Sequence, residues 1–226
     1  MKGVIIKAIG LLFFLIFISV NSVFAQNSYI KEKQINIKQS QQSLSNFVSI
    51  YNQAIKEINE EITKLNQIEK SVNNFKDLKG IQKLINQYSN LKQKAQDLKQ
   101  KLSDAYITFR MKTFKVLEKA PISDELRDYF YKYMIDNQRI LEEAFDLLAD
   151  YAEKKQKALL YLESLNKTKG YIVKDNKLYF FNKNNLERFK TLEEEANETL
   201  NQAIKKLKEF TSQHKNLIKE INEQFQ

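Results

Sequence analysis

The fold is decided by one stretch, residues 168–184, which reads TKGYIVKDNKLYFFNKN. It contains two short runs of β-branched and aromatic residues, 171–173 and 178–181, with four polar residues between them. Such runs favour strands, and a short polar break between them is typical of a β-hairpin. Asp175 and Asn176 tolerate the positive φ that a tight turn demands, so we place the turn at these two residues.

This turn fixes the register of the two strands. Opposing residues then have numbers that add up to 351, and the pairs are Lys174 with Lys177, Val173 with Leu178, Ile172 with Tyr179 and Tyr171 with Phe180. The chain on both sides of the hairpin folds back about the same centre. We therefore expect the hairpin and the helices that flank it to share one axis.

The hairpin is also the best candidate for a binding site. A two-stranded ribbon is rarely stable alone, so one face must pack on the rest of the protein, and the other face is available to a partner. The partner-binding candidates are Tyr171, Val173, Leu178, Tyr179, Phe180 and Phe181. The alternative is that the hairpin only caps the bundle, because a modest exposed apolar patch is not diagnostic of binding.

The rest of the chain after residue 25 predicts long helices, because Gly80, Gly170 and Pro121 are its only glycines and proline. Apolar residues recur in heptads, and one seam follows alternating steps of four and three through Leu84, Tyr88, Leu91, Ala95, Leu98, Leu102, Ala105 and Phe109. We predict a first helix from about Ser28 to residues 73–74 or to Gly80, and a second that ends at Pro121.

A third helix is predicted to start at Ser123, whose hydroxyl can cap it, and to end near Lys167. A fourth is predicted to start with a capping box formed by Asn184 and Glu187. The fold class is therefore all-α: a long antiparallel four-helix bundle, similar to a coiled coil, with a small β-hairpin inserted between the third and fourth helices. We expect residues 26–226 to form a single elongated bundle with residues 168–184 at its tip. The alternative is two long helical hairpins that diverge or swap into a homo-oligomer.

Two polar residues, Asn137 and His214, occupy core positions of this pattern, and their numbers also add up to 351. We expect them to share one layer of the bundle with Ala105 and to hydrogen-bond to each other. The favoured interpretation is a pair that fixes the helix register, and the alternative is a pH switch based on the imidazole.

Residues 1–25 differ from the rest of the chain. Lys2 and Lys7 precede an apolar run over residues 8–20, and Val23-Phe24-Ala25 ends the segment with a small residue. This pattern predicts a cleaved signal peptide, with an uncleaved membrane anchor as the alternative. We therefore expect a periplasmic or secreted protein, and the absence of cysteine excludes disulfides and a lipoprotein anchor.

The composition argues against an enzyme. There is no cysteine, only one histidine and no Gly-rich phosphate loop, so we expect no catalytic site, cofactor or metal. Glu193–Glu195 are consecutive on a helix, point in three directions and are predicted to be solvated surface, although Glu193 falls on the helix seam close to the hairpin.

Charge is concentrated in the second predicted helix, where residues 76–119 hold 11 basic and 4 acidic side chains. This surface could bind anionic lipid, but residues 121–165 hold 10 acidic and 6 basic side chains and are expected to neutralise it. A membrane surface is therefore not the favoured partner. Nucleic acid is not expected, because no aromatic side chains alternate with the lysines.

These patterns predict an exported, non-catalytic binding or scaffold protein that presents the aromatic hairpin to a protein partner or to another component of the cell envelope. The combination of long helical hairpins, a basic surface and export resembles the general architecture of the Skp family. That resemblance is one of architecture, and it implies a periplasmic holdase chaperone as the alternative.

Overall fold

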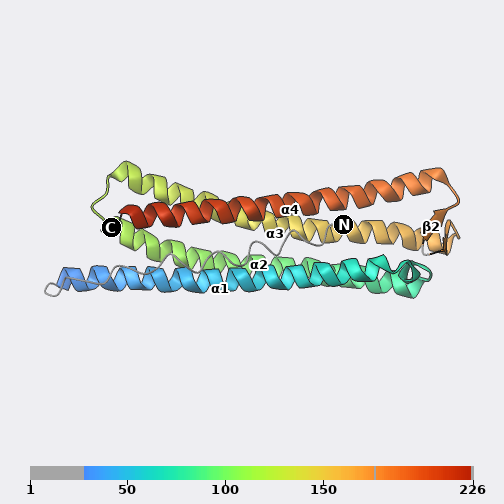
Figure 1. The fold of residues 1–226 in the computed structure, drawn as a ribbon, viewed down its shortest axis with the longest axis horizontal. Coiled ribbons are helices and arrows are strands. Elements are labelled where there is room, and N and C mark those ends of the chain that lie inside the picture. The colour runs from blue at the N-terminus through green and yellow to red at the C-terminus, as the bar shows by residue number, and fades with distance from the viewer. Residues whose placement is uncertain (1–27, 176, 225–226) are drawn as a thin grey trace. The chain divides into compact units, whose positions relative to one another are not determined.

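The structure is a computed structural model that describes residues 28–175 and 177–224 of the 226-residue chain. The chain forms four long helices and a short antiparallel hairpin, which can be followed in Figure 1. The elements in chain order are α1 (Ser28–Lys70), the 3₁₀ helix η1 (Val72–Phe75), α2 (Leu78–Glu118), α3 (Asp124–Lys167), β1 (Tyr171–Lys174), β2 (Lys177–Phe180) and α4 (Lys183–Gln224). The predicted signal peptide, residues 1–25, lies outside the described residues.

The helices pack in two compact units, and each unit takes part of every helix. Unit 1 contains the described residues of 1–55, 99–143 and 206–226, and unit 2 contains 56–98 and 144–205. The single elongated bundle over residues 26–226 stays a prediction.

Successive helices run antiparallel within each unit. In unit 1, Ser103 and Arg110 of α2 contact Glu142 and Gln138 of α3, so residue numbers rise on one helix as they fall on the other. In unit 2 the same order joins Gln82 to Glu163 and Lys92 to Glu153. The predicted fold class is confirmed: four helices pack against each other, with a two-stranded hairpin between α3 and α4.

The predicted seam of α2 is confirmed as core. All eight of its residues are buried, and the most exposed of them, Ala105, is only 8% exposed. Burial of apolar area at this repeat is the main stabilising contribution to such a bundle, at roughly 25 cal/mol per Å².

The first connection differs from the prediction, because α1 ends at Lys70 and α2 already begins at Leu78, which places Gly80 in the first turn of α2. Side chains explain both ends. Asn74 Nδ2 donates to the Ile68 carbonyl at 2.7 Å, and the Gly80 N–H donates to Asp77 Oδ1 at 2.8 Å. A Cβ on Gly80 would lie 2.2 Å from the Asn74 carbonyl oxygen, so glycine lets η1 pass close over α2.

The start of α3 is confirmed, because the Leu126 N–H donates to Ser123 Oγ at 3.2 Å. The predicted capping box at the start of α4 is wrong. Asn182 is the cap, and its Oδ1 accepts the N–H of Asn184 at 2.8 Å. Asparagine is a good N-cap at either position, so Asn182, two residues before Asn184, could take this role.

Candidate functional site

The hairpin has the predicted register. Tyr171 pairs with Phe180, Ile172 with Tyr179, Val173 with Leu178, and Lys174 with Lys177. Asp175 adopts a φ of 49°, as a tight turn requires, and Asn176 lies outside the described residues.

The exit from α3 sets the direction of the hairpin. The Gly170 N–H donates to the Leu165 carbonyl at 2.7 Å, which is the long hydrogen bond of a Schellman motif. The left-handed residue of this motif is Lys169, with a φ of 55°, at a position that glycine usually takes. Because Gly170 is close to Leu165, where a Cβ would lie 3.0 Å from Cδ2, the first strand leaves the helix in tight contact.

One face of the hairpin, the inner face, is anchored to the rest of unit 2. Tyr171 is 5% exposed, and its hydroxyl donates to the Phe75 carbonyl at 2.6 Å and accepts from Asn166 Nδ2 at 3.2 Å. Phe180 packs between the rings of Tyr171 and Phe189, with centroids 5.8 and 5.6 Å away. The hydrogen bond from Tyr171 to Phe75 joins the hairpin to the α1–α2 connection, as expected for an antiparallel bundle.

Four of the six partner-binding candidates therefore lie on the inner face. They are Tyr171, Val173, Leu178 and Phe180, which alternate along the strands and are buried or half-buried. Burial raises the pKa of the Tyr171 phenol, so the hydroxyl stays protonated and available as a donor. The inner face acts as a cap.

The other face, called the outer face, consists of Ile172, Lys174, Lys177, Tyr179 and Phe181. Tyr179 is 43% exposed and Phe181 66% exposed, and both were candidates. Ile172 is 44% exposed and was not among them, although its cross-strand pairing with Tyr179 was predicted. The predicted pairing with Tyr179 was the signal that could have identified Ile172 as a partner-binding candidate. The outer face combines apolar surface with two cations.

Unit 1 contains a neutral polar layer, formed by Asn137 and His214, both fully buried. The His214 ring contacts Phe47, Tyr106, Phe109 and Phe210 at centroid distances of 5.4 to 5.7 Å. Burial lowers the pKa of His214 to about 3, so the imidazole is neutral at physiological pH.

The contact within this layer differs from the prediction. The expected hydrogen bond between Asn137 and His214 is not formed in the part of the chain that the structure describes. Asn137 instead lies near the Tyr106 hydroxyl: burial raises the pKa of Tyr106, and Asn137 opposes that rise. Tyr106, which follows the predicted Ala105, is thus the neighbour that the two polar residues share.

Unit 2 contains a charged layer that we did not predict, formed by Glu69, Tyr88, Lys155 and Glu193. Lys155 Nζ lies 2.9 Å from Glu69 Oε1 and 2.7 Å from Glu193 Oε2, and the Lys155 side chain is only 5% exposed. The Tyr88 hydroxyl donates to Glu69 Oε1 at 2.9 Å. The prediction that Glu193 is solvated surface is therefore wrong, while Glu194 and Glu195 are exposed.

The spacing of the core residues in α3 was the available signal for this layer. Lys155 falls four residues after Tyr151 and three before Ala158, at a position where the pattern demands a core residue. Burial alone would lower the pKa of Lys155, but Glu69 and Glu193 raise it above its ordinary value. Burial also raises the pKa of Glu69, against the lowering effect of Lys155. Each charge is held by its partners, as buried ions must be.

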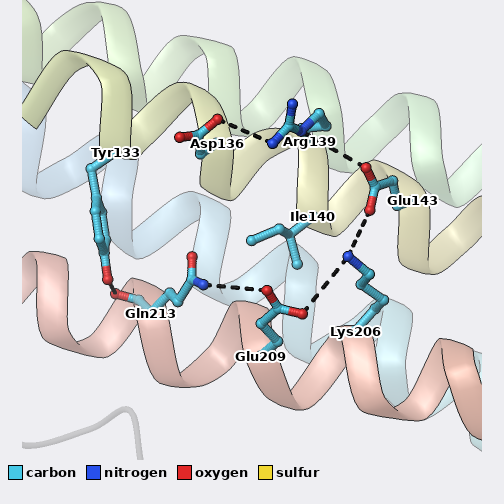
Figure 2. Close-up of a pocket in the computed structure, with 8 residues that line it drawn as sticks. All are labelled: Tyr133, Asp136, Arg139, Ile140, Glu143, Lys206, Glu209 and Gln213. Carbon is cyan, nitrogen blue, oxygen red and sulfur yellow. Dashed lines mark hydrogen bonds and ion pairs between the residues drawn. The ribbon is translucent and has the colours of Figure 1, made fainter.

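A hollow of about 320 Å³ lies between α3 and α4 in unit 1. Figure 2 shows its charged side chains in a continuous chain of contacts. The pairs are Asp136 with Arg139, Arg139 with Glu143, Glu143 with Lys206, and Lys206 with Glu209. Because every charge in the hollow already has a protein partner, a ligand would have to break ion pairs to bind there.

The basic surface of α2 is partly neutralised by its neighbours. Lys92 pairs with Glu153 of α3 at 2.8 Å, and Lys94 pairs with Glu57 of α1 at 3.3 Å. Hydrogen bonds from Lys92 and from Lys157 lower the pKa of Glu153 to about 2.

Two further features bear on the site. The residues that the structure describes contain no group of three or more His, Cys, Asp or Glu that could hold a metal ion. None of the described helices combines the length and apolar character needed to cross a membrane.

Comparisons with protein-family models, with curated proteins and with solved structures give no match. The class of this protein is therefore defined by its own fold, a four-helix bundle with a hairpin inserted between α3 and α4. The outer face of that hairpin is the candidate functional site.

Proposed function

We propose that this is an exported, non-catalytic binding protein whose helical bundle holds the outer face of the hairpin toward a partner in the cell envelope. The observation that carries the proposal is the division of the hairpin into two unlike faces. The inner face is anchored through the 2.6 Å hydrogen bond from Tyr171 to Phe75, and the outer face exposes Ile172, Tyr179 and Phe181. Three large apolar side chains side by side on an anchored ribbon form an exposed apolar patch of the kind that a partner covers on binding.

Export is supported by the composition of residues 1–25. A non-catalytic role is supported by the way in which two clusters of charged side chains are paired. The charged layer of unit 2 is closed around Lys155, and the charges of the hollow in unit 1 are paired with one another. Neither arrangement leaves a group poised for acid-base or nucleophilic chemistry.

The test is affinity capture from a native envelope fraction, with bound components identified by mass spectrometry. Wild type is compared with Tyr179→Ser/Phe181→Ser. The matched control is Met111→Ser/Ile135→Ser, which removes two side chains of unit 1 that are 57% and 50% exposed. The proposal expects a component that is retained by wild type and by the control and lost from the hairpin variant. Equal capture by all three proteins would contradict it.

A second assay separates this proposal from a Skp-like holdase. A holdase suppresses the aggregation of many unfolded clients, so wild type would protect a denatured model substrate. We expect no such protection from a protein that binds through one small hairpin face.

A further inference from the structure

The surroundings of the hairpin are strongly basic. Residues 167–183 contain five lysines and one acidic residue, Asp175. Lys167 and Lys183 form ion pairs with residues of their own helices, at 3.2 and 3.5 Å. The Lys183 pair is exposed on both sides, and such a pair holds little charge back from a partner. Within the described ranges, no carboxylate is at ion-pair distance from the three remaining lysines, Lys169, Lys174 and Lys177.

These three lysines stand where the fold would favour other residues. Lys174 and Lys177 are directly opposite each other across the strands, and like charges in this arrangement are destabilising. Lys169 has a φ of 55°, where glycine is the usual residue. Residues kept at a cost to stability point to a role outside the fold.

Two of these lysines, Lys174 and Lys177, lie on the same face as the exposed apolar side chains. Successive side chains of a strand alternate between faces, so Lys174 lies on the face of Ile172, and Lys177 lies on the face of Tyr179 and Phe181. The outer face therefore has two cations near the turn and three apolar groups near the base. An aromatic side chain in the interfacial region and a lysine at the phosphate level form the usual pairing at a membrane surface.

The size of the outer face argues against a folded protein as its occupant. A stable protein–protein interface takes about 800 Å² and about 20 to 30 residues from each partner. The outer face has five residues, too few for such an interface but enough for shallow insertion into a lipid surface.

We propose that the outer face of the hairpin docks onto a lipid surface that carries anionic headgroups. The side chains of Ile172, Tyr179 and Phe181 enter the interfacial region, and Lys174 and Lys177 contact phosphates. This inference rests on the proposed binding function and names the chemistry of the partner.

The chain has no tryptophan, so one substitution supplies a fluorescent reporter at the site itself. Tyr179→Trp is titrated with vesicles of phosphatidylcholine alone and with vesicles that contain phosphatidylglycerol. The matched control is Tyr129→Trp in unit 1, because Tyr129 is 44% exposed and Tyr179 is 43% exposed. We expect a blue shift of the emission only for Tyr179→Trp and only with the anionic vesicles. The same shift for Tyr129→Trp, or with neutral vesicles, would overturn the proposal.

A second pair of variants tests the lysines. In the Tyr179→Trp background, Lys174→Gln/Lys177→Gln should weaken binding to anionic vesicles about fivefold per lysine. Lys83→Gln/Lys101→Gln makes the same change of net charge on α2, and it should leave the affinity within about twofold. Equal weakening by the two pairs would show attraction by net charge alone and would contradict the proposed site.

The outcomes also separate this inference from the proposed function. If anionic vesicles give no shift while envelope capture still depends on Tyr179 and Phe181, the lipid proposal fails and the binding function stands. If vesicle binding and capture both fail, both proposals are wrong. Polyglutamate serves as the probe for an acidic peptide, and a blue shift with it in the absence of vesicle binding would replace lipid with an acidic protein segment.

Discussion

The buried polar layers and the outer face of the hairpin break the apolar pattern of the bundle in opposite ways. Asn137, His214 and Lys155 are polar groups inside a core, whereas Tyr179 and Phe181 are large apolar groups in contact with solvent. A polar group inside is enclosed by its neighbours on every side, so its removal should change stability. An apolar group in contact with solvent is only partly packed against the chain, so its removal should change binding and leave stability nearly constant.

The two layers also differ from each other. In unit 1 the imidazole of His214 is surrounded by four aromatic rings, and burial keeps it neutral. In unit 2 the Lys155 ammonium lies between two carboxylates and is held charged. A polar residue at a core position is thus kept neutral where its neighbours are aromatic rings and kept ionised where counter-ions reach it.

The largest effect is expected at the charged layer. Lys155→Met keeps most of the side-chain volume but leaves Glu69 and Glu193 together without a cation. Loss of one member of a buried ion pair typically costs about 3–5 kcal/mol, and we expect a loss of this size in urea unfolding. Lys157→Met is the control, since Lys157 is 58% exposed and should change stability by less than about 0.5 kcal/mol. A loss below about 1 kcal/mol for Lys155→Met would show that the layer contributes little.

The next effect is a pH dependence that belongs to His214. Its pKa is about 3 in the folded protein, against 6.5 ordinarily, so between these values the unfolded chain binds more protons than the folded one. The free energy of unfolding must then fall as the pH falls below about 6.5, by about 3 kcal/mol at pH 4 from this group. His214→Leu removes this dependence.

The measurement is the difference in unfolding free energy between wild type and His214→Leu at pH 7 and at pH 4. The difference is needed because Glu69 acts in the opposite direction. Its raised pKa means that the folded protein takes up a proton more readily, so its contribution to stability grows as the pH falls. An unchanged difference at the two pH values would mean that His214 is solvated enough to charge in place.

A smaller loss is expected from Tyr171→Phe on the inner face. The substitution keeps the ring and removes the hydroxyl, which leaves the Phe75 carbonyl and the Asn166 amide each short of a bond. We expect a loss of about 1–2 kcal/mol in thermal unfolding. Tyr179→Phe on the outer face should change stability by less than about 0.5 kcal/mol, and equal losses for the two variants would remove the distinction between the faces.

The sequence predicted the parts of the fold that depend on a repeating pattern. Heptad spacing identified the α2 seam from Leu84 to Phe109, and the polar break at residues 174–177 identified the hairpin and its register. It was less successful at helix ends. Asn74, Asp77 and Asn182 all supply caps, and an asparagine or aspartate near a helix boundary does not by itself show which backbone group it will reach.

The candidate site was half predictable for a similar reason. Strand alternation separates Tyr179 and Phe181 from Leu178 and Phe180, but it does not say which set faces the helices. That choice depends on the Tyr171 hydroxyl reaching Phe75, a contact between residues 96 positions apart in the chain. The charged layer needed three helices in register before the lysine at position 155 could be matched with its two carboxylates.

The central claim is that the inner face of the hairpin serves the fold and the outer face serves binding. The most direct test is the thermal unfolding of Tyr179→Ser/Phe181→Ser beside wild type, followed by the anionic vesicle and envelope capture assays on the same preparation. We predict a change in stability of less than about 0.5 kcal/mol together with the loss of binding. A loss of about 2 kcal/mol or more, with binding retained, would show that the outer face is part of the cap and would contradict the account.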